Sequence, residues 1–176
     1  MAAPIFLIGY RCTGKTTTGK RLAEMLGRSF VDTDRLLETT AGTTITRMVD
    51  SRGWEYFRKE ETRTLTSLDL SRALVVATGG GIILSEENRG FIRKNGPAIW
   101  LKADVDTIMT RLASDSGTAD SRPALTNTGI AEETSRMLDI RTPLYSGLAT
   151  FSINTADHTP EAAAEIIIRK LENERF

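Results

Sequence analysis

The first apolar run of the chain leads directly into a glycine-bounded loop, in the stretch Ile5-Phe6-Leu7-Ile8-Gly9-Tyr10-Arg11-Cys12-Thr13-Gly14-Lys15-Thr16. From Gly9 onward this stretch matches the pattern G-x-x-x-x-G-K-[ST]. A helical pattern begins at about Lys15 and ends near Leu26, where Gly27 is a typical helix stop. Strand, glycine loop and helix in this order are the context in which the pattern binds phosphate. The stretch therefore predicts a phosphate-binding loop rather than an ordinary glycine turn.

The residues of this loop suit the binding of a nucleotide. Glycines allow the backbone to curl until successive N–H groups face a phosphate, and the start of the following helix adds its positive end. Lys15 can reach the outer phosphates, and the Thr16 hydroxyl can ligate Mg²⁺. Cys12 stands where many such loops have glycine. A thiol beside Lys15 and a helix N-terminus could be reactive, but a tolerated small side chain is the simpler interpretation.

Downstream of the loop, short apolar runs alternate with helical patterns. Further strands are expected at Phe30–Val31, Ala73–Ala77, Ala98–Leu101 and Thr150–Ile153. Helices are expected at about Arg35–Thr40, Ile45–Arg52, Trp54–Ser67, Ser85–Lys94 with Ser85 as N-cap, Val105–Ala113 and Ile130–Arg141, and from Pro160 onward. This alternation predicts a three-layer α/β/α sandwich around a five-stranded parallel sheet, in a single domain of residues 1–176. Ligands of such sheets bind beyond the carboxyl ends of the strands.

The polar segment Ser114–Gly129 interrupts this alternation. It contains Gly117 and Pro123 and shows no hydrophobic periodicity. A stretch of this length inside a compact domain is usually functional, so we expect a mobile lid over the site.

Composition excludes several classes of function. The 176 residues include 23 basic and 23 acidic side chains, without the excess positive charge of a nucleic-acid-binding protein. A single cysteine and a single histidine exclude an internal disulfide and any multi-cysteine or histidine-rich metal site. No apolar run approaches the roughly 18 residues of a membrane span, and the N-terminal residues lack a signal-peptide pattern. We expect a cytoplasmic, monomeric protein that binds neither nucleic acid nor a membrane.

Two carboxylates, Asp32 and Asp34, follow the second predicted strand. With a period of two they leave the chain on the same side, and we expect them to face Lys15 and Thr16 because the ends of adjacent parallel strands are neighbours. Phosphoryl transfer needs Mg²⁺ to neutralise charge and a group that positions the attacking hydroxyl, and two carboxylates could divide these roles. Alternatively, Asp34 is the N-cap of the helix that follows it.

The run Gly79-Gly80-Gly81 follows a strand that is expected to be buried. Three glycines carry an entropic cost, which indicates that a ligand or another part of the chain approaches the backbone closely there. A flexible connection between strand and helix is the alternative, but one glycine would usually be enough for it.

Several short motifs follow one another along nearly the whole chain. They are the loop Gly9–Thr17, the pair in Asp32-Thr33-Asp34, the F-R-x-x-E stretch Phe57-Arg58-Lys59-Glu60-Glu61, the run Ala77-Thr78-Gly79-Gly80-Gly81, Arg122-Pro123, and Arg141 with Tyr145. The phosphate loop alone occurs in many nucleotide-binding proteins, whereas the ordered set resembles the shikimate kinase family. This resemblance implies a P-loop fold like that of the nucleoside monophosphate kinases, with a mobile lid.

The resemblance also implies a reaction and a set of site residues. The family transfers the γ-phosphate of ATP to the 3-hydroxyl of shikimate with Mg²⁺, giving 3-phosphoshikimate and ADP in aromatic amino-acid biosynthesis. By resemblance, ATP is bound by Cys12, Thr13, Gly14, Lys15, Thr16, Thr17 and Arg122, and the 154–160 loop lies near the adenine. Mg²⁺ is bound by Thr16 and Asp32. Shikimate is bound by Asp34, Arg58, Gly79, Gly80, Gly81 and Arg141. Lys15, Asp34 and Arg122 take the catalytic roles.

The chemistry of these side chains agrees with such an acceptor. Shikimate carries one carboxylate and several hydroxyls. The guanidinium groups of Arg58 and Arg141 can bind a carboxylate with two parallel hydrogen bonds, and Asp34 can accept a hydrogen bond from a hydroxyl. The alternative is that these arginines are ordinary surface residues, with Arg58 paired to Glu61 one helical turn away.

Other functions with the same loop remain to be weighed. A kinase for a sugar acid or for a nucleoside monophosphate would share the fold. A GTP-dependent switch would explain the D-x-x-G match at Asp50–Gly53 and the likeness of Asn154–Asp157 to N-K-x-D, but Asp50 follows a helical segment and Thr155 replaces the lysine. A structural module with an inactive loop is disfavoured because Lys15, Thr16, Asp32 and Asp34 are all present.

Overall fold

A computed structural model describes residues 3–114 and 129–173, so the predicted lid falls almost entirely outside the described residues. The described chain forms a parallel sheet of five strands in the order β2-β3-β1-β4-β5. The strands are β1 (Ile5–Ile8), β2 (Ser29–Asp32), β3 (Leu74–Ala77), β4 (Ala98–Lys102) and β5 (Phe151–Asn154). The predicted five-stranded parallel sheet is confirmed.

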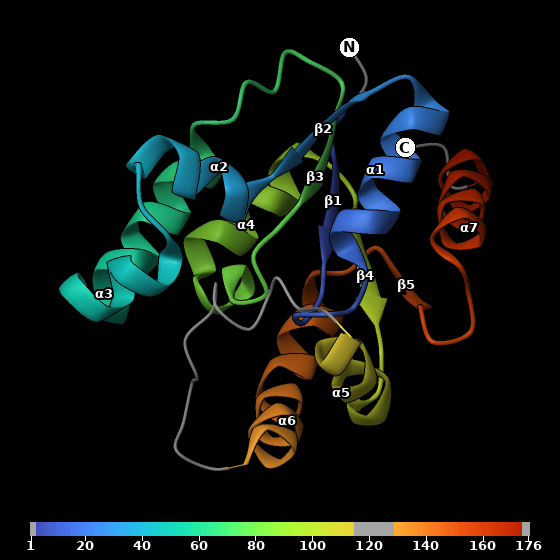
Figure 1. Ribbon diagram of the computed structural model, residues 1–176. Coiled ribbons are helices and arrows are strands. Elements are labelled where there is room, and N and C mark those ends of the chain that lie inside the picture. Colours follow the sequence, from blue (N-terminus) through green and yellow to red (C-terminus); the bar gives the residue numbers. More distant parts are fainter. Residues whose placement is uncertain (1–2, 115–128, 174–176) are drawn as a thin grey trace.

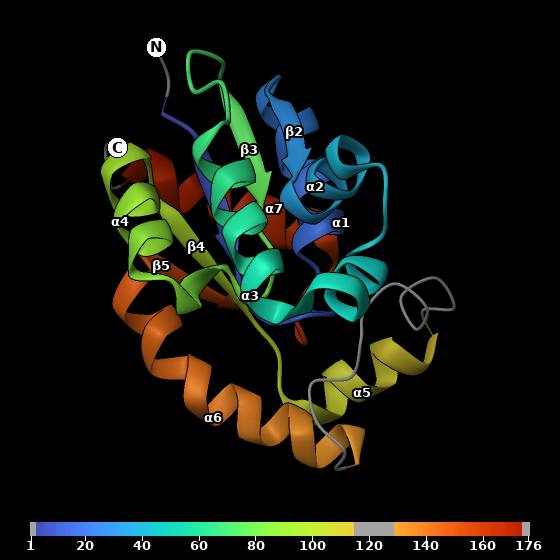
Figure 2. The ribbon, with the colours of Figure 1, turned by 90° about the vertical axis from the view of Figure 1, so that its left-hand side faces the viewer.

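Helices cover both faces of the sheet (Figures 1 and 2). They are α1 (Lys15–Leu26), α2 (Thr33–Ala41), α3 (Ile45–Thr66), α4 (Glu86–Asn95), α5 (Val105–Ser114), α6 (Ile130–Leu148) and α7 (Pro160–Asn173), with the short 3-10 helix η1 (Ile82–Leu84). Helices α1 and α7 pack on one face, and α3, α4 and α6 contribute to the core on the other. Within residues 3–114 and 129–173, no helix is both long enough and apolar enough to cross a membrane.

Strand β1 shows why the sheet is buried on both faces. Its side chains alternate: Ile5 and Leu7 join the core under α1 and α7, whereas Phe6 and Ile8 join the core under α3, α4 and α6. All four are almost completely buried. An uninterrupted apolar run therefore gives a central strand, because each face of the strand meets a layer of helices.

Two helices differ from the expected boundaries. Helix α6 continues beyond Arg141, across Pro143, to Leu148. Proline removes one helical hydrogen bond, but the added turns bury Tyr145 and Leu148 in the core, and this packing holds the helix together. Helix α3 merges the two predicted segments, with Gly53 left in a non-helical conformation at φ 79° between them.

Candidate active site

The phosphate loop joins the carboxyl end of β1 to the start of α1. Gly14 precedes the helix in a left-handed conformation with φ 85°, which glycine adopts without strain. Lys15 is only 8% exposed, and its Nζ donates hydrogen bonds to the carbonyl oxygens of Gly9 and Tyr10 at 2.8 and 2.6 Å. The lysine thus lies along the inside of a loop that is already curled.

Cys12 is the strained residue of this loop. Its φ of 58° places it in the left-handed region, where a Cβ atom is disfavoured, and among the described residues it is the only non-glycine there. Its carbonyl oxygen accepts a hydrogen bond from Arg111 NH1 at 3.2 Å. The chain therefore keeps a conformation typical of glycine although it has a side chain at this position.

Polar contacts of Arg111 and Thr155 support the phosphate loop on the side of β5. Arg111 on α5 donates to the Thr155 carbonyl oxygen at 2.6 Å and to its hydroxyl at 2.9 Å. The Thr155 hydroxyl lies 3.0 Å from the carbonyl oxygen of Thr13. A small cavity beside these contacts is lined by Gly14, Thr17, Thr18, Arg111, Thr155, His158 and Pro160. The segment expected near the adenine thus borders the phosphate loop, whereas Arg111 was not singled out from the sequence, because a helical arginine carries no local signal.

The two aspartates lie near the loop for a different reason than expected. Strand β2 pairs with β3, not with β1, so the expectation of adjacent strands is wrong. Asp32 nevertheless accepts a hydrogen bond from the Thr16 hydroxyl at 2.8 Å, because α1 packs against β2. The N-cap of α2 is Asp32, which accepts from the amides of Asp34 and Arg35; the alternative with Asp34 as N-cap is therefore wrong.

A pocket opens beyond the carboxyl ends of β1 and β3. It is lined by Tyr10, Arg11, Asp34, Ile45, Trp54, Phe57, Arg58, Glu61, Gly79, Gly80, Gly81 and Arg141. Every residue that the sequence predicts for the acceptor is among them. The phosphate loop forms one wall through Tyr10 and Arg11, so a molecule in this pocket would lie next to a phosphate in the loop.

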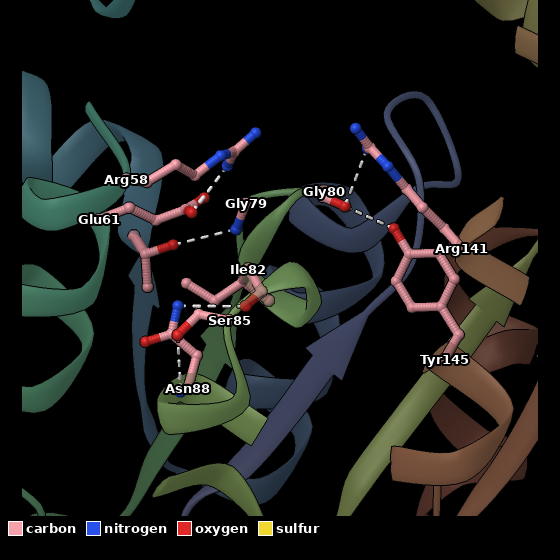
Figure 3. A network of polar contacts seen from close by, with 10 residues as sticks. Arg58, Glu61, Gly79, Gly80, Ile82, Ser85, Asn88, Arg141 and Tyr145 are labelled. Carbon is pink, nitrogen blue, oxygen red and sulfur yellow. Dashed lines mark hydrogen bonds and ion pairs between the residues drawn. The ribbon is translucent and has the colours of Figure 1, made fainter. Parts of the chain in front are cut away.

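The glycine run is explained by close approach. A Cβ atom on Gly79 would lie 2.6 Å from Asp34 Oδ1 and 2.7 Å from Glu61 Oε1. A Cβ atom on Gly81 would overlap the guanidinium group of Arg58. None of the three glycines has a positive φ, so the need for glycine here is steric. Figure 3 shows Arg58 and Glu61 beside the turn that follows β3.

Arg58 and Glu61 form an ion pair at the wall of the pocket. Arg58 NH1 lies 2.7 Å from Glu61 Oε2, as the spacing of one helical turn allows, but Glu61 is only 3% exposed, so this is no surface pair. Burial raises the pKa of Glu61, and the charge of Arg58 partly offsets that rise. Within the described chain, Glu61 Oε1 is buried and accepts no hydrogen bond.

Arg141 enters the pocket from α6 on the opposite side of the glycine turn (Figure 3). It is 5% exposed, and its NH1 donates to the Gly80 carbonyl oxygen at 3.2 Å. Among residues 3–114 and 129–173 it forms no ion pair, and its Nε is buried without a hydrogen-bond partner. The Glu61 carboxyl acts on Arg141 through its charge but does not contact it, and a buried guanidinium without a contacting carboxylate is unfavourable, so the arrangement suits an anionic ligand.

Two contacts of the pocket were not foreseen. The guanidinium groups of Arg11 and Arg141 both lie over the Tyr10 ring, at 5.4 and 5.3 Å from its centroid. Arg11 also pairs with the buried Glu133 of α6 at 2.9 Å. No local pattern could have revealed this pairing, since its partners are 122 residues apart.

Two other expectations have different outcomes. Arg122 lies outside the described residues, so its predicted role stays a prediction. The D-x-x-G match at Asp50–Gly53 falls inside α3 and not after a strand beside the phosphate loop, which argues against the GTP-dependent switch.

Comparison with known proteins points to one family. The sequence model of a family described as "SKI: Shikimate kinase" matches residues 11–172. The chain is 44% identical over 173 residues to "Shikimate kinase 2" of Enterobacter sp. (strain 638), covering 97% of each chain. Among solved structures, it superposes on shikimate kinase from Acinetobacter baumannii in complex with shikimate, with a TM-score of 0.92, 33% identity, and coverage of 100% of this chain and 96% of that one. For shikimate kinase from Bacteroides thetaiotaomicron the TM-score is 0.87 at 27% identity, with coverage of 97% and 98%.

Proposed function

The chain belongs to the shikimate kinase family, whose members are ATP-dependent kinases, and on that premise we propose that it transfers the γ-phosphate of ATP to the 3-hydroxyl of shikimate. The products are 3-phosphoshikimate and ADP, in aromatic amino-acid biosynthesis. One observation carries the choice of acceptor: Arg141 is buried and, within the described residues, forms no ion pair, in a pocket that adjoins the phosphate loop. An acceptor that brings its own carboxylate supplies the missing ion-pair partner.

ATP binds with its phosphates in the loop that ends at Thr17. The amides of this loop and the positive end of α1 attract the phosphate oxygens. Lys15 exchanges its hydrogen bonds to the Gly9 and Tyr10 carbonyl oxygens for contacts with the transferred phosphate. The family resemblance adds Arg122 as a further contact to ATP.

Mg²⁺ fits the pair formed by Thr16 and Asp32. Their side chains present a hydroxyl and a carboxylate oxygen 2.8 Å apart, and Mg²⁺ prefers oxygen ligands. Within the described chain, no group of three or more histidine, cysteine or acidic side chains could hold a metal ion. This agrees with a cation that keeps several waters and takes its other ligands from the phosphates. When bound, it neutralises charge on the phosphates.

Shikimate binds with its carboxylate between Arg58 and Arg141. Charge-assisted hydrogen bonds from two guanidinium groups fix the orientation of the ring. Among residues 3–114 and 129–173, the amides of Gly80 and Gly81 donate no hydrogen bond, so they are available to an acceptor oxygen. Asp34 lies against Gly79 beside Glu61 and accepts a hydrogen bond from a ring hydroxyl.

The transfer step needs mainly position and charge. The transition state of phosphoryl transfer is loose, so the protein gains most by holding the attacking oxygen in line with the γ-phosphate. Asp34 orients the 3-hydroxyl and takes up its proton. Lys15 stabilises the negative charge on the phosphate during its transfer. The shared wall of phosphate loop and pocket sets the distance between donor and acceptor.

An assay of ADP release tests the proposal. With ATP and Mg²⁺, we expect rapid turnover with shikimate and none above background with gluconate. Lys15→Ala should abolish turnover with either acceptor. Turnover with gluconate would favour a sugar-acid kinase, and tight GDP binding without acceptor-dependent turnover would favour a nucleotide switch; either result contradicts the proposal.

A further inference from the structure

Helix α6 sends two side chains to a single backbone atom. Arg141 NH1 and the Tyr145 hydroxyl both donate hydrogen bonds to the carbonyl oxygen of Gly80, at 3.2 and 2.6 Å (Figure 3). The two residues are one helical turn apart and therefore share a face of the helix. Arg141 lines the pocket, whereas Tyr145 is completely buried behind it. The tyrosine does not line the pocket, and its hydrogen bond reaches a bound molecule through Gly80 and the neighbouring Arg141.

The position of the tyrosine ring is fixed by the sheet. Trp100 of β4 stacks on it with a centroid distance of 5.6 Å and an angle of 19° between the rings. Trp100 is in register with Ile8, the last residue of β1 before the phosphate loop. Burial raises the pKa of the Tyr145 hydroxyl, which therefore stays protonated and able to donate. The hydroxyl is a rigid anchor for the carbonyl that it contacts.

Gly80 lies between the phosphate loop and the acceptor pocket. A Cβ atom on it would lie 3.3 Å from the Arg11 amide nitrogen and 3.5 Å from the Gly9 carbonyl oxygen, so its backbone packs against the phosphate loop. On either side, Gly79 and Gly81 pack against the side chains that face the acceptor. A change in the orientation of the Gly80 peptide would therefore alter the acceptor pocket.

We propose that Tyr145 is a positioning residue for the acceptor, whose hydroxyl holds the Gly80 carbonyl so that Arg141 and the neighbouring amides stay directed at the bound shikimate. A carbonyl oxygen accepts two hydrogen bonds, and here the tyrosine supplies one and the arginine the other. Without the hydroxyl, the guanidinium of Arg141 is the remaining donor and is drawn toward the carbonyl, away from the ligand. This inference rests on the proposed function.

Tyr145→Phe tests the inference, because it keeps the ring and its stacking on Trp100 and removes only the hydroxyl. We expect the KM for shikimate to rise about five- to tenfold, as for the loss of one good hydrogen bond. The dissociation constant of ATP, measured without acceptor, should stay within about twofold, since Lys15 and the loop amides are untouched. Tyr56→Phe, which removes a hydroxyl from α3 outside the pocket, should leave both constants unchanged.

A double-mutant cycle separates positioning from a purely structural role. If Tyr145 acts through Arg141 and Gly80, the effects of Tyr145→Phe and Arg141→Met on the shikimate KM are not additive. Additive effects, or a lower melting temperature with an unchanged shikimate KM, would overturn the inference, as would an equal loss of ATP affinity. A wild-type protein without shikimate-dependent ADP release would remove the proposed function itself, and this inference with it.

Discussion

Arg58 and Arg141 illustrate how one residue type acquires two different roles at the same pocket. Arg58 is paired with Glu61 and partly exposed, so its charge is balanced before any ligand binds. Arg141 is buried and, within the described chain, has backbone and sulfur contacts but no carboxylate partner. Under the proposed function, a ligand carboxylate would therefore add a second partner to Arg58 and the first ion-pair partner to Arg141.

Arg58→Ala should weaken acceptor binding. Loss of a charge-assisted hydrogen bond amounts to about 1.5–3 kcal/mol, so the KM for shikimate should rise roughly ten- to hundredfold. The dissociation constant of ATP should change little, because the polar contact of Arg58 within the described chain is with Glu61 and not with the phosphate loop. Steady-state kinetics with each substrate varied in turn measure both effects.

Arg63→Ala is the matched control for this substitution. Arg63 lies on the same helix, is 80% exposed, and has only a 3.8 Å contact with Glu60. We expect wild-type kinetics from it. If Arg58→Ala lowers ATP affinity instead of shikimate affinity, the assignment of the pocket to the acceptor is wrong.

Cys12→Gly should stabilise the protein by relieving the left-handed conformation of this residue. That conformation costs about 1–2 kcal/mol for a residue with a side chain, and glycine avoids this cost. Glycine also loses more conformational entropy on folding, which offsets about 0.5–1 kcal/mol of the gain. A net gain of about 0.5–1 kcal/mol in the free energy of unfolding is expected, measured by urea denaturation. Cys12→Ala removes the thiol but keeps the Cβ atom, so it should bring no such gain. Equal stabilities of the two variants would show that the thiol, and not the backbone, decides the effect.

At the scale of elements, the turn after β3 is the part of the site with the least room. Gly79→Ala would force apart the carboxylates of Asp34 and Glu61, which lie 2.6 and 2.7 Å from the new Cβ position. We expect the shikimate KM to rise at least about tenfold while ATP binding is retained. The argument is steric, so the larger Gly79→Val should be worse still.

Gly90→Ala is the control for Gly79→Ala. It adds the same methyl group at a position where we expect no harm to shikimate binding. Gly90 lies inside α4, where an added Cβ atom would meet no other described atom within 4 Å. Alanine should therefore stabilise this helix by about 0.5–1 kcal/mol and leave the kinetics unchanged. A Gly79→Ala variant with normal shikimate kinetics would contradict the close packing of the turn after β3.

The elements were predictable where their signals are local, and their arrangement was not. Ser85 caps α4 and Pro160 begins α7 as expected, because capping and proline act within one turn. The insertion of β3 between β1 and β2 depends on contacts between distant segments, and so does the continuation of α6 past Pro143. For the same reason the main acceptor residues could be named from motifs, whereas Arg11, Glu133 and the role of Tyr145 required the fold.

At the scale of the whole molecule, the buried carboxyl of Glu61 should make stability depend on pH. Its pKa in the folded protein is raised by burial, so between the unfolded pKa of about 4.3 and the folded value the native state binds more protons than the unfolded state. The contribution of Glu61 to stability is complete below that window and is lost as the pH rises through it. Glutamine does not titrate, so the Glu61→Gln variant does not lose stability in this way. The unfolding free energy of the variant minus that of the wild type should therefore increase with pH across the window and then level off.

Urea denaturation of both proteins between pH 3 and pH 8 measures this difference, which cancels the other titrating groups. Glu55→Gln, on the same helix, should give the opposite sign. A hydrogen bond and the charge of Lys59 lower the pKa of Glu55, so its contribution is present at neutral pH and lost in acid. The effect should also be small, because Glu55 is exposed and water screens the pair. A difference for Glu61→Gln that falls with rising pH would mean that the attraction of Arg58 outweighs burial and lowers the pKa of Glu61 in the folded protein.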